Sequence, residues 1–201
     1  MLKKLLLLWS QIQSSMIKTK PSKIIIVAAL CSSLVSCMKW GNRENSRLIQ
    51  QAQLLTEQMP DSALRLLDMV NTVRFNNAER MEYTLLRVQA RGLAEMDLTT
   101  DTEIFQAREY FIGRKDKEKA ALACFYAGQA LLAQDKVDEA VACYLEANDF
   151  ASHLDDDQLK GQIANQIGRA NYLLGLIDHS LPFFLQAIDF FRTAGNRRSE
   201  E

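Results

Sequence analysis

From Asn45 onward, apolar residues recur three and four positions apart over most of the chain, as they do on the buried face of an amphipathic helix. Alternation of apolar and polar residues, which would indicate β-strands, never extends over a useful length. The pattern therefore predicts an all-α domain over residues 45–195. Its helices are expected at about 44–58, 61–72, 78–95, 102–112, 115–134, 137–153, 157–175 and 178–194.

Two short segments indicate where predicted helices begin. Pro60 cannot donate a backbone hydrogen bond and ends the first helix, and Asp61 or Ser62 can then cap the second one. A run of three aspartates at 155–157 forms a polar linker, whose last acid, Asp157, is expected to cap the helix that follows. Both segments agree with helices joined by short turns.

The last part of the predicted helical domain contains an internal repeat with a spacing of 40 residues. Four positions show a small, a small, an aromatic and a small residue in the same order in both copies. They are Gly128, Ala140, Tyr144 and Ala147 in one copy and Gly168, Ser180, Phe184 and Ala187 in the other. Small residues allow two helices to pack closely, so each copy is predicted to be a helical hairpin.

The spacing of these four positions resembles the signature of the tetratricopeptide (TPR) family. The segment from Met59 to Asp68 is also similar to TPR lipoproteins of Gram-negative bacteria. Upstream the match is weaker: Ala90 is expected to hold the small position of the second hairpin, and Gln89 stands where an apolar residue is usual. The resemblance covers most of 43–192 and implies antiparallel helical hairpins stacked as a TPR-like right-handed solenoid.

An apolar segment that ends in a cysteine precedes the helical region. Three lysines (Lys18, Lys20 and Lys23) come before the apolar residues 24–31, which is the layout of a secretory signal. The following Leu34-Val35-Ser36-Cys37 resembles the lipobox of bacterial lipoproteins, which implies that Cys37 is acylated and becomes the mature N-terminus.

Residues 1–37 are therefore expected to be an N-terminal extension and signal peptide, 38–44 a linker and 196–201 a tail. Two alternatives to lipidation remain. A retained membrane-spanning helix would need about 20 apolar residues, and serines interrupt this run; ordinary signal cleavage would need an A-x-A-like site, which is absent. The start is also open: Met16 would give a complete compact signal, whereas Met1 adds a second apolar patch.

Charge and cysteine usage narrow the function classes. Five of the 24 basic residues and none of the 25 acidic residues precede Cys37, which leaves 19 basic against 25 acidic residues, a net charge of −6. This balance argues against nucleic-acid binding, which needs a basic surface. Cys124 and Cys143 are expected to be small buried apolar residues, with a disulfide between them as the alternative.

The sequence offers no constellation for catalysis or metal binding. The chain has two histidines, His153 and His179, and neither has acidic or thiol partners at the spacing of a metal site. No nucleophile motif or phosphate-binding glycine loop is present in a strand context. We therefore expect no enzyme activity, no metal and no cofactor.

The TPR resemblance implies a ligand-binding face built from the first helix of each hairpin. With Ala90, Gly128 and Gly168 at the small position, the candidate peptide-binding residues are Arg87, Arg91, Phe125, Gln129, Asn165, Arg169 and Tyr172. Three arginines and no acid in this set favour an acidic or carboxylate-bearing peptide, because guanidinium groups bind carboxylates through two hydrogen bonds. The alternative is that the arginines form an ordinary solvated helix surface.

These observations predict a lipid-anchored scaffold that mediates protein–protein interactions, facing the periplasm from the outer membrane. The alternative is the N-terminal sensory or docking region of a longer membrane-associated signalling or transcription regulator, of which this chain would be a truncated piece. Phe183, Phe190 and Phe191 would leave apolar surface at the last hairpin, so self-association through that face is also expected.

Overall fold

The computed structural model describes residues 43–200, with side chains as far as residue 195. The predicted signal peptide, both candidate start residues and the lipidation site Cys37 lie outside the described residues. The segment Leu48–Glu201 forms one compact unit, which contains all of the described helices from α3 onward.

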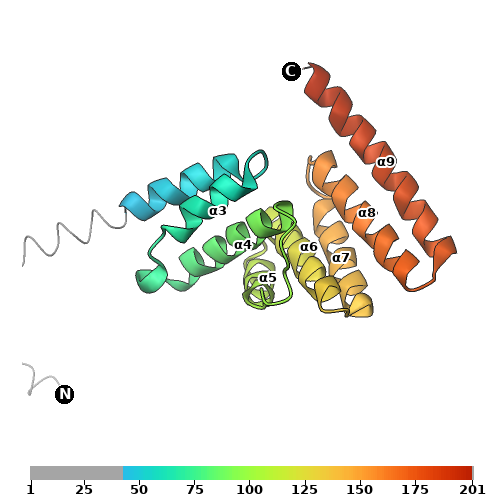
Figure 1. The fold of residues 1–201 in the computed structure, drawn as a ribbon. Helices are drawn as coiled ribbons and strands as arrows, with labels where there is room; N and C mark the ends of the chain where they lie inside the picture. The colour runs from blue at the N-terminus through green and yellow to red at the C-terminus, as the bar shows by residue number, and fades with distance from the viewer. Residues whose placement is uncertain (1–42, 201) are drawn as a thin grey trace, which may run out of the picture. The chain divides into compact units, whose positions relative to one another are not determined.

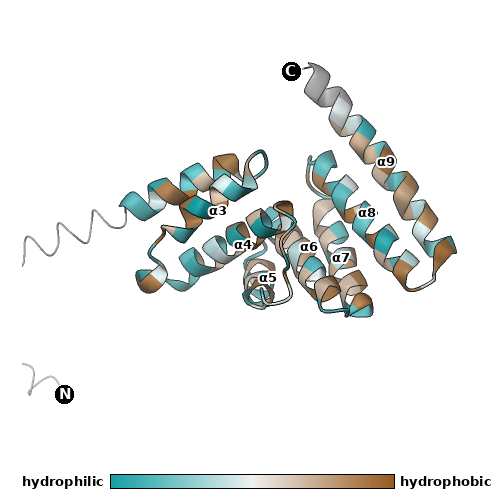
Figure 2. Cartoon of the chain, in the orientation of Figure 1, coloured by the Kyte–Doolittle hydropathy of each residue, from teal (hydrophilic) through white to brown (hydrophobic). Residues whose placement is uncertain are grey.

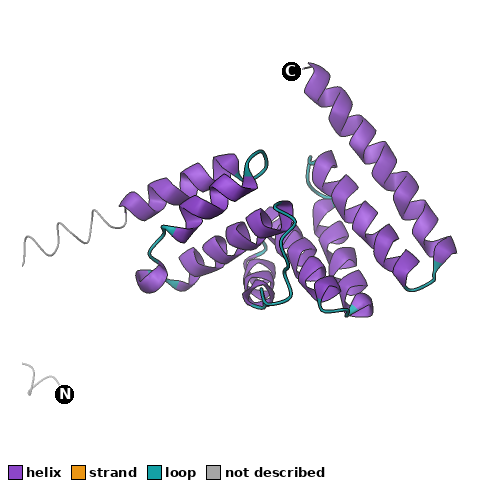
Figure 3. Ribbon diagram, viewed as in Figure 1, coloured by secondary structure: helices purple, strands orange, loops and turns teal. Residues whose placement is uncertain are grey.

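The described residues are helical or form turns, with no strand among them, which confirms the all-α prediction (Figure 3). Every predicted helix is present. Residues 43–55 are helical, and the following elements are α3 (Pro60–Asp68), the short 3₁₀ helix η1 (Thr72–Arg74), α4 (Asn77–Leu93), α5 (Glu103–Arg114), α6 (Lys117–Ala133), α7 (Val137–Ala151), α8 (Asp157–Leu173) and α9 (Ile177–Glu200).

From α3 to α9, each α-helix packs against the next one in the sequence, and α4 also contacts α6 (Figure 1). α9 extends to Glu200, so most of the segment predicted as a tail continues this helix. Long-range packing therefore follows chain order, with each helix contacting near neighbours in sequence.

The helices α4, α6 and α8 repeat each other with a period of 40 residues. Each has 17 residues, and they begin at residues 77, 117 and 157. The preceding residues, Asn76, Asp116 and Asp156, accept hydrogen bonds from backbone N–H groups three positions later, at 3.0, 3.2 and 2.9 Å. The prediction that Asp157 caps α8 is wrong by one position: Asp156 is the cap, and Asp157 is the first residue of the helix.

The C-terminal ends of the same three helices are also equivalent. Glu95, Asp135 and Gly175 follow them in the left-handed conformation, with φ of 55°, 62° and 76°. Such a residue reverses the chain and lets the last helical carbonyls accept backbone hydrogen bonds. Only glycine adopts this conformation without a steric penalty, so the first two turns repeat in geometry where the sequence does not. The repeat therefore extends one hairpin further upstream than the residue pattern shows.

This period corrects the register predicted for the second hairpin. Ala90 is fully buried, but it is equivalent to Ala130 and Ala170, which are also fully buried. The residue 40 positions before Gly128 is Val88, which is 3 % exposed. The predicted register was therefore shifted by two residues, because the small residue of α4 is Ala90, whereas Val88 occupies the position of the two glycines.

The two glycines of the sequence repeat lie where neighbouring helices pack too closely for a side chain, as predicted. A Cβ added at Gly128 in α6 would be 2.5 Å from the ring of Tyr144 in α7. A Cβ at Gly168 in α8 would be 2.9 Å from the ring of Phe184 in α9. In both hairpins the aromatic ring thus occupies the space that a side chain on the first helix would need.

The first hairpin differs from the prediction at its cap. Met59 is the N-cap of α3 and makes no side-chain cap hydrogen bond, so neither Asp61 nor Ser62 caps this helix. Pro60 is the first residue of α3, where its fixed φ suits the helix and its missing N–H has no cost. Ala63 and Leu67 are fully buried and pack with Ala52, Leu86 and Ala90.

α9 carries an exposed apolar stripe. Leu181, Leu185 and Ile188 are 57, 55 and 52 % exposed, and hydrophobic segments recur along the coloured part of this helix (Figure 2). Phe183 and Phe190 are only partly exposed. Among the described residues, no helix combines the length and the hydropathy that crossing a membrane requires.

Candidate functional site

One set of helices lines two adjoining cavities of about 650 and 490 Å³. All lining residues come from 53–58, α4, α6, the N-cap residue Asp156 and the beginning of α8, and none comes from α3, α5, α7 or α9. The two cavities share six residues, so we treat them as one site, the polar hollow. The shared residues are Glu57, Gln58, Gln89, Leu122, Asp156 and Leu159.

Equivalent positions of the 40-residue repeat line the polar hollow. Glu82, Leu122 and Gln162 occupy the same position in α4, α6 and α8, and Glu118 and Gln158 share another position. The hollow is therefore a product of the repeat, since the same helix surface is presented three times in succession.

The lining is acidic and rich in amides. Its acidic residues are Glu57, Glu82, Glu118 and Asp156, and its one cationic residue is Lys119. The ammonium group of Lys119 lies 2.7 Å from Glu82 and 3.9 Å from Asp116, so its charge is already compensated. Amide side chains at five positions can donate and accept hydrogen bonds. They are Gln53, Gln58, Gln89, Gln158 and Gln162.

Tyr126 forms part of the wall of the hollow. It is only 3 % exposed, and its hydroxyl, which has no hydrogen-bond partner among the described residues, is not one of the fully buried polar atoms. Burial raises the pKa of this hydroxyl, and the nearby Glu57 carboxylate raises it further. The ring fits because Gly92 faces it: a Cβ at that position would be 2.9 Å from the ring. A neutral hydroxyl on a largely buried ring therefore lies at this wall, where the charge of a carboxylate acts on it.

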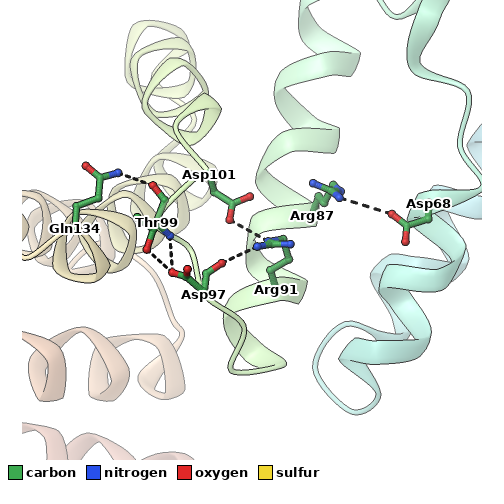
Figure 4. A network of polar contacts seen from close by, with 7 residues as sticks. All are labelled: Asp68, Arg87, Arg91, Asp97, Thr99, Asp101 and Gln134. Carbon is green, nitrogen blue, oxygen red and sulfur yellow. Dashed lines mark hydrogen bonds and ion pairs between the residues drawn. The ribbon is translucent and has the colours of Figure 1, made fainter.

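The structure pairs two arginines of the predicted peptide-binding set with acids of the same chain (Figure 4). Arg91 Nε lies 2.9 Å from Asp101, and the two side chains are only 19 and 9 % exposed. Its guanidinium also donates to the carbonyl of Asp97 at 2.6 Å. Arg87 lies 3.7 Å from Asp68 in a more exposed pair. These arginines support the loop after α4 and the contact with α3.

The loop between α4 and α5 explains why Arg91 is engaged in this way. α5 begins at Glu103, whereas the equivalent α7 and α9 begin directly after their turns at Val137 and Ile177. The longer connection contains Asp97 and Asp101, both bound by Arg91. Gln134 at the end of α6 donates to the carbonyl of Thr99 at 3.0 Å, which joins the loop to the next hairpin (Figure 4).

The remaining residues of the predicted set do not form one surface. Phe125 is 3 % exposed and packs against Tyr126 and Tyr144, so its side chain belongs to the core. Gln129 and Arg169 line a third cavity of about 430 Å³, together with the acidic Glu95 and Asp97. Asn165 and Tyr172 lie on α8 with exposed side chains.

The two-residue shift in α4 explains only part of why sequence reasoning missed the polar hollow, because the residues predicted in α6 and α8, where the register was correct, do not line it. With Val88 at the small position, the residues three before and one after it are Leu85 and Gln89, and both line the hollow. Gln89 had been noted as a departure from the apolar pattern. The departure came from the shifted register, because Gln129 and Arg169, at the equivalent positions of α6 and α8, are polar as well.

The buried thiols lie beside an ion pair between α5 and α7. Arg108 pairs with Glu146, and the Cys124 sulfur is 3.7 Å from the Glu146 carboxylate. Both Cys124 and Cys143 are free and buried, as predicted. Burial raises the pKa of the Cys124 thiol to about 12, although Arg108 opposes this shift, and burial also raises the pKa of Cys143.

Both thiols are expected to resist alkylation by iodoacetamide at pH 8 in the native protein and to react when denaturant is added, because the thiolate is the reactive form. Labelling followed by mass spectrometry measures this directly. The free energy of unfolding is also expected to fall as the pH rises above about 9, since the unfolded chain then releases protons that the folded chain retains. Rapid native labelling of Cys124 would contradict this account.

No group of histidine, cysteine and acidic side chains within the described part of the chain could hold a metal ion. His153 and His179 are exposed. No protein-family model and no curated protein match the chain.

Proposed function

We propose that this chain is a lipid-anchored scaffold of the cell envelope that binds a segment of another protein and carries out no catalysis. The observation that carries the proposal is the polar hollow, about 650 Å³ in its larger part, which is lined by equivalent positions of α4, α6 and α8. A surface that repeats at a fixed spacing suits an extended chain, because a polypeptide presents similar groups at regular intervals.

We also propose that the hairpins form a TPR-like right-handed solenoid. Three features support this proposal: the 40-residue period of α4, α6 and α8, the packing of each helix against the next one, and the glycine–aromatic contacts within the last two hairpins. In such an array the first helices of successive hairpins share one face, and these are the helices that line the polar hollow.

Site-specific photocrosslinking in the cell that expresses the protein tests the scaffold function. A photoreactive amino acid at Gln89 or Gln162, in the hollow, is expected to capture a discrete protein partner. The matched control is the same amino acid at Asp138, which is exposed on α7 and lines neither cavity of the hollow. Equal capture of a partner by the hollow positions and by Asp138, or no capture from the hollow, would refute a partner site in the hollow.

Replacing Cys37 with serine is expected to move the protein from the membrane fraction to the soluble fraction, because the acyl chains that anchor it are lost. Ultracentrifugation of lysed cells followed by immunoblotting measures the distribution. The matched control is Cys31→Ser, which changes a cysteine within the same apolar run. A Cys37→Ser protein that stays with the membrane would favour a retained spanning helix.

A further inference from the structure

We propose that the polar hollow selects a positively charged, extended protein segment, with lysine or arginine side chains bound by Glu57, Glu118 and Asp156. This inference rests on the proposed function and specifies the chemistry of the partner. It differs from the acidic ligand that the arginines at 87, 91 and 169 suggested from sequence.

The first step of the argument is charge. Glu57 and Glu118 form no ion pair with any lysine or arginine of the described residues. One Asp156 oxygen accepts the cap hydrogen bond from the Leu159 N–H, which leaves the negative charge of this carboxylate uncompensated by a cation. Since Lys119 is paired with Glu82, the lining carries an excess of negative charge that a cationic ligand would balance.

The second step is the unpartnered hydroxyl of Tyr126. This side chain is 97 % buried, lines the larger cavity and lies close enough to Glu57 for the carboxylate to affect its ionisation. The hydroxyl is not fully buried and has no hydrogen-bond partner among the described residues, so a ligand in the cavity can accept its hydrogen bond. A peptide carbonyl could accept from the hydroxyl while a neighbouring lysine or arginine pairs with Glu57.

The third step is the amide lining. Glutamine side chains donate and accept at once, so they can bind the backbone of a peptide of any sequence. Gln89 and Gln162 stand on α4 and α8, with the apolar Leu122 of α6 also in the wall. The glutamines therefore account for binding of an extended backbone, whereas the carboxylates account for the choice of charge.

Selection from a random peptide library displayed on phage tests the inference on the purified full-length chain. The selected peptides are expected to be enriched in lysine and arginine. They are then measured by fluorescence anisotropy against a hollow variant, Glu57→Gln/Glu118→Gln/Asp156→Asn, in which asparagine preserves the helix cap.

The matched control removes three negative charges from α7, at positions that line neither cavity of the hollow: Asp138→Asn/Glu139→Gln/Asp149→Asn. Binding is expected to weaken about tenfold or more for the hollow variant and less than about twofold for the control, since solvent-facing ion pairs each contribute modestly. Thermal unfolding followed by circular dichroism verifies that both variants are folded.

Three results would overturn the inference. Selected peptides that depend on the hollow but are neutral or acidic would refute the cationic partner and leave the proposed function standing. Cationic peptides that lose affinity equally for both variants would show attraction to overall charge only. Selection that yields no peptide dependent on the hollow would refute both the inference and the binding function.

Discussion

Replacing Gly128 with leucine is expected to lower the free energy of unfolding by about 3 kcal/mol, because the new side chain would overpack a filled interface. The first added carbon would lie 2.5 Å from Tyr144 Cε1 and 2.7 Å from Cδ1. Tyr144 is fully buried and cannot swing into solvent. Chemical denaturation followed by circular dichroism measures the loss of unfolding free energy. Replacing Gly168 with leucine is expected to cost about 1–3 kcal/mol for the same reason.

The matched control is Gly113→Leu in α5. A Cβ there would meet no atom within 4 Å. Leucine is a better helix former than glycine, so this variant is expected to gain about 0.5 kcal/mol. If the two substitutions changed stability by the same amount, the close contact between α6 and α7 would not exist as described.

Replacing Arg91 with methionine is expected to destabilise the protein by about 3 kcal/mol, because Asp101 would keep its charge in a site only 9 % exposed. Methionine retains an apolar stem like that of arginine, so the loss of stability reports on the charge and the hydrogen bonds of the guanidinium group. The hydrogen bond to Asp97 would be lost as well, which would loosen the connection between α4 and α5.

Arg87→Met provides the comparison. Arg87 and Asp68 are 39 and 65 % exposed at 3.7 Å, so this change is expected to cost at most about 0.5 kcal/mol. The double variant Arg91→Met/Asp101→Asn is expected to recover part of the lost stability, since no uncompensated charge stays buried. An Arg91→Met protein as stable as the parent would mean that Arg91 is free to serve a ligand.

The sequence predicted the helices well because each packs one apolar face against its neighbours, and that face appears as a three-and-four spacing. It predicted the last two hairpins best, because Gly128 and Gly168 mark contacts that no larger residue fits. In the second hairpin Val88 replaces the glycine, and the equivalence became visible through the bounds and N-cap of α4 and the backbone geometry at Glu95.

The candidate site could not be predicted to the same degree. Two errors combined: the register in α4 was shifted by two residues, and the arginines were considered without the acids that the fold brings to them. Asp101 lies ten residues from Arg91 in a loop whose length departs from the repeat. The periodicity of the sequence cannot show such a contact, because the contact depends on a loop that departs from the repeat.

Hydrogen–deuterium exchange on the full-length chain, with and without the tightest peptide from the selection, tests most directly whether the face shared by α4, α6 and α8 is the binding site. Backbone amides exchange more slowly where a ligand suppresses local opening. We predict slower exchange in residues 53–58, α4, α6 and the beginning of α8, with α5, α7 and α9 unchanged. Protection confined to α5, α7 or α9 would contradict this account.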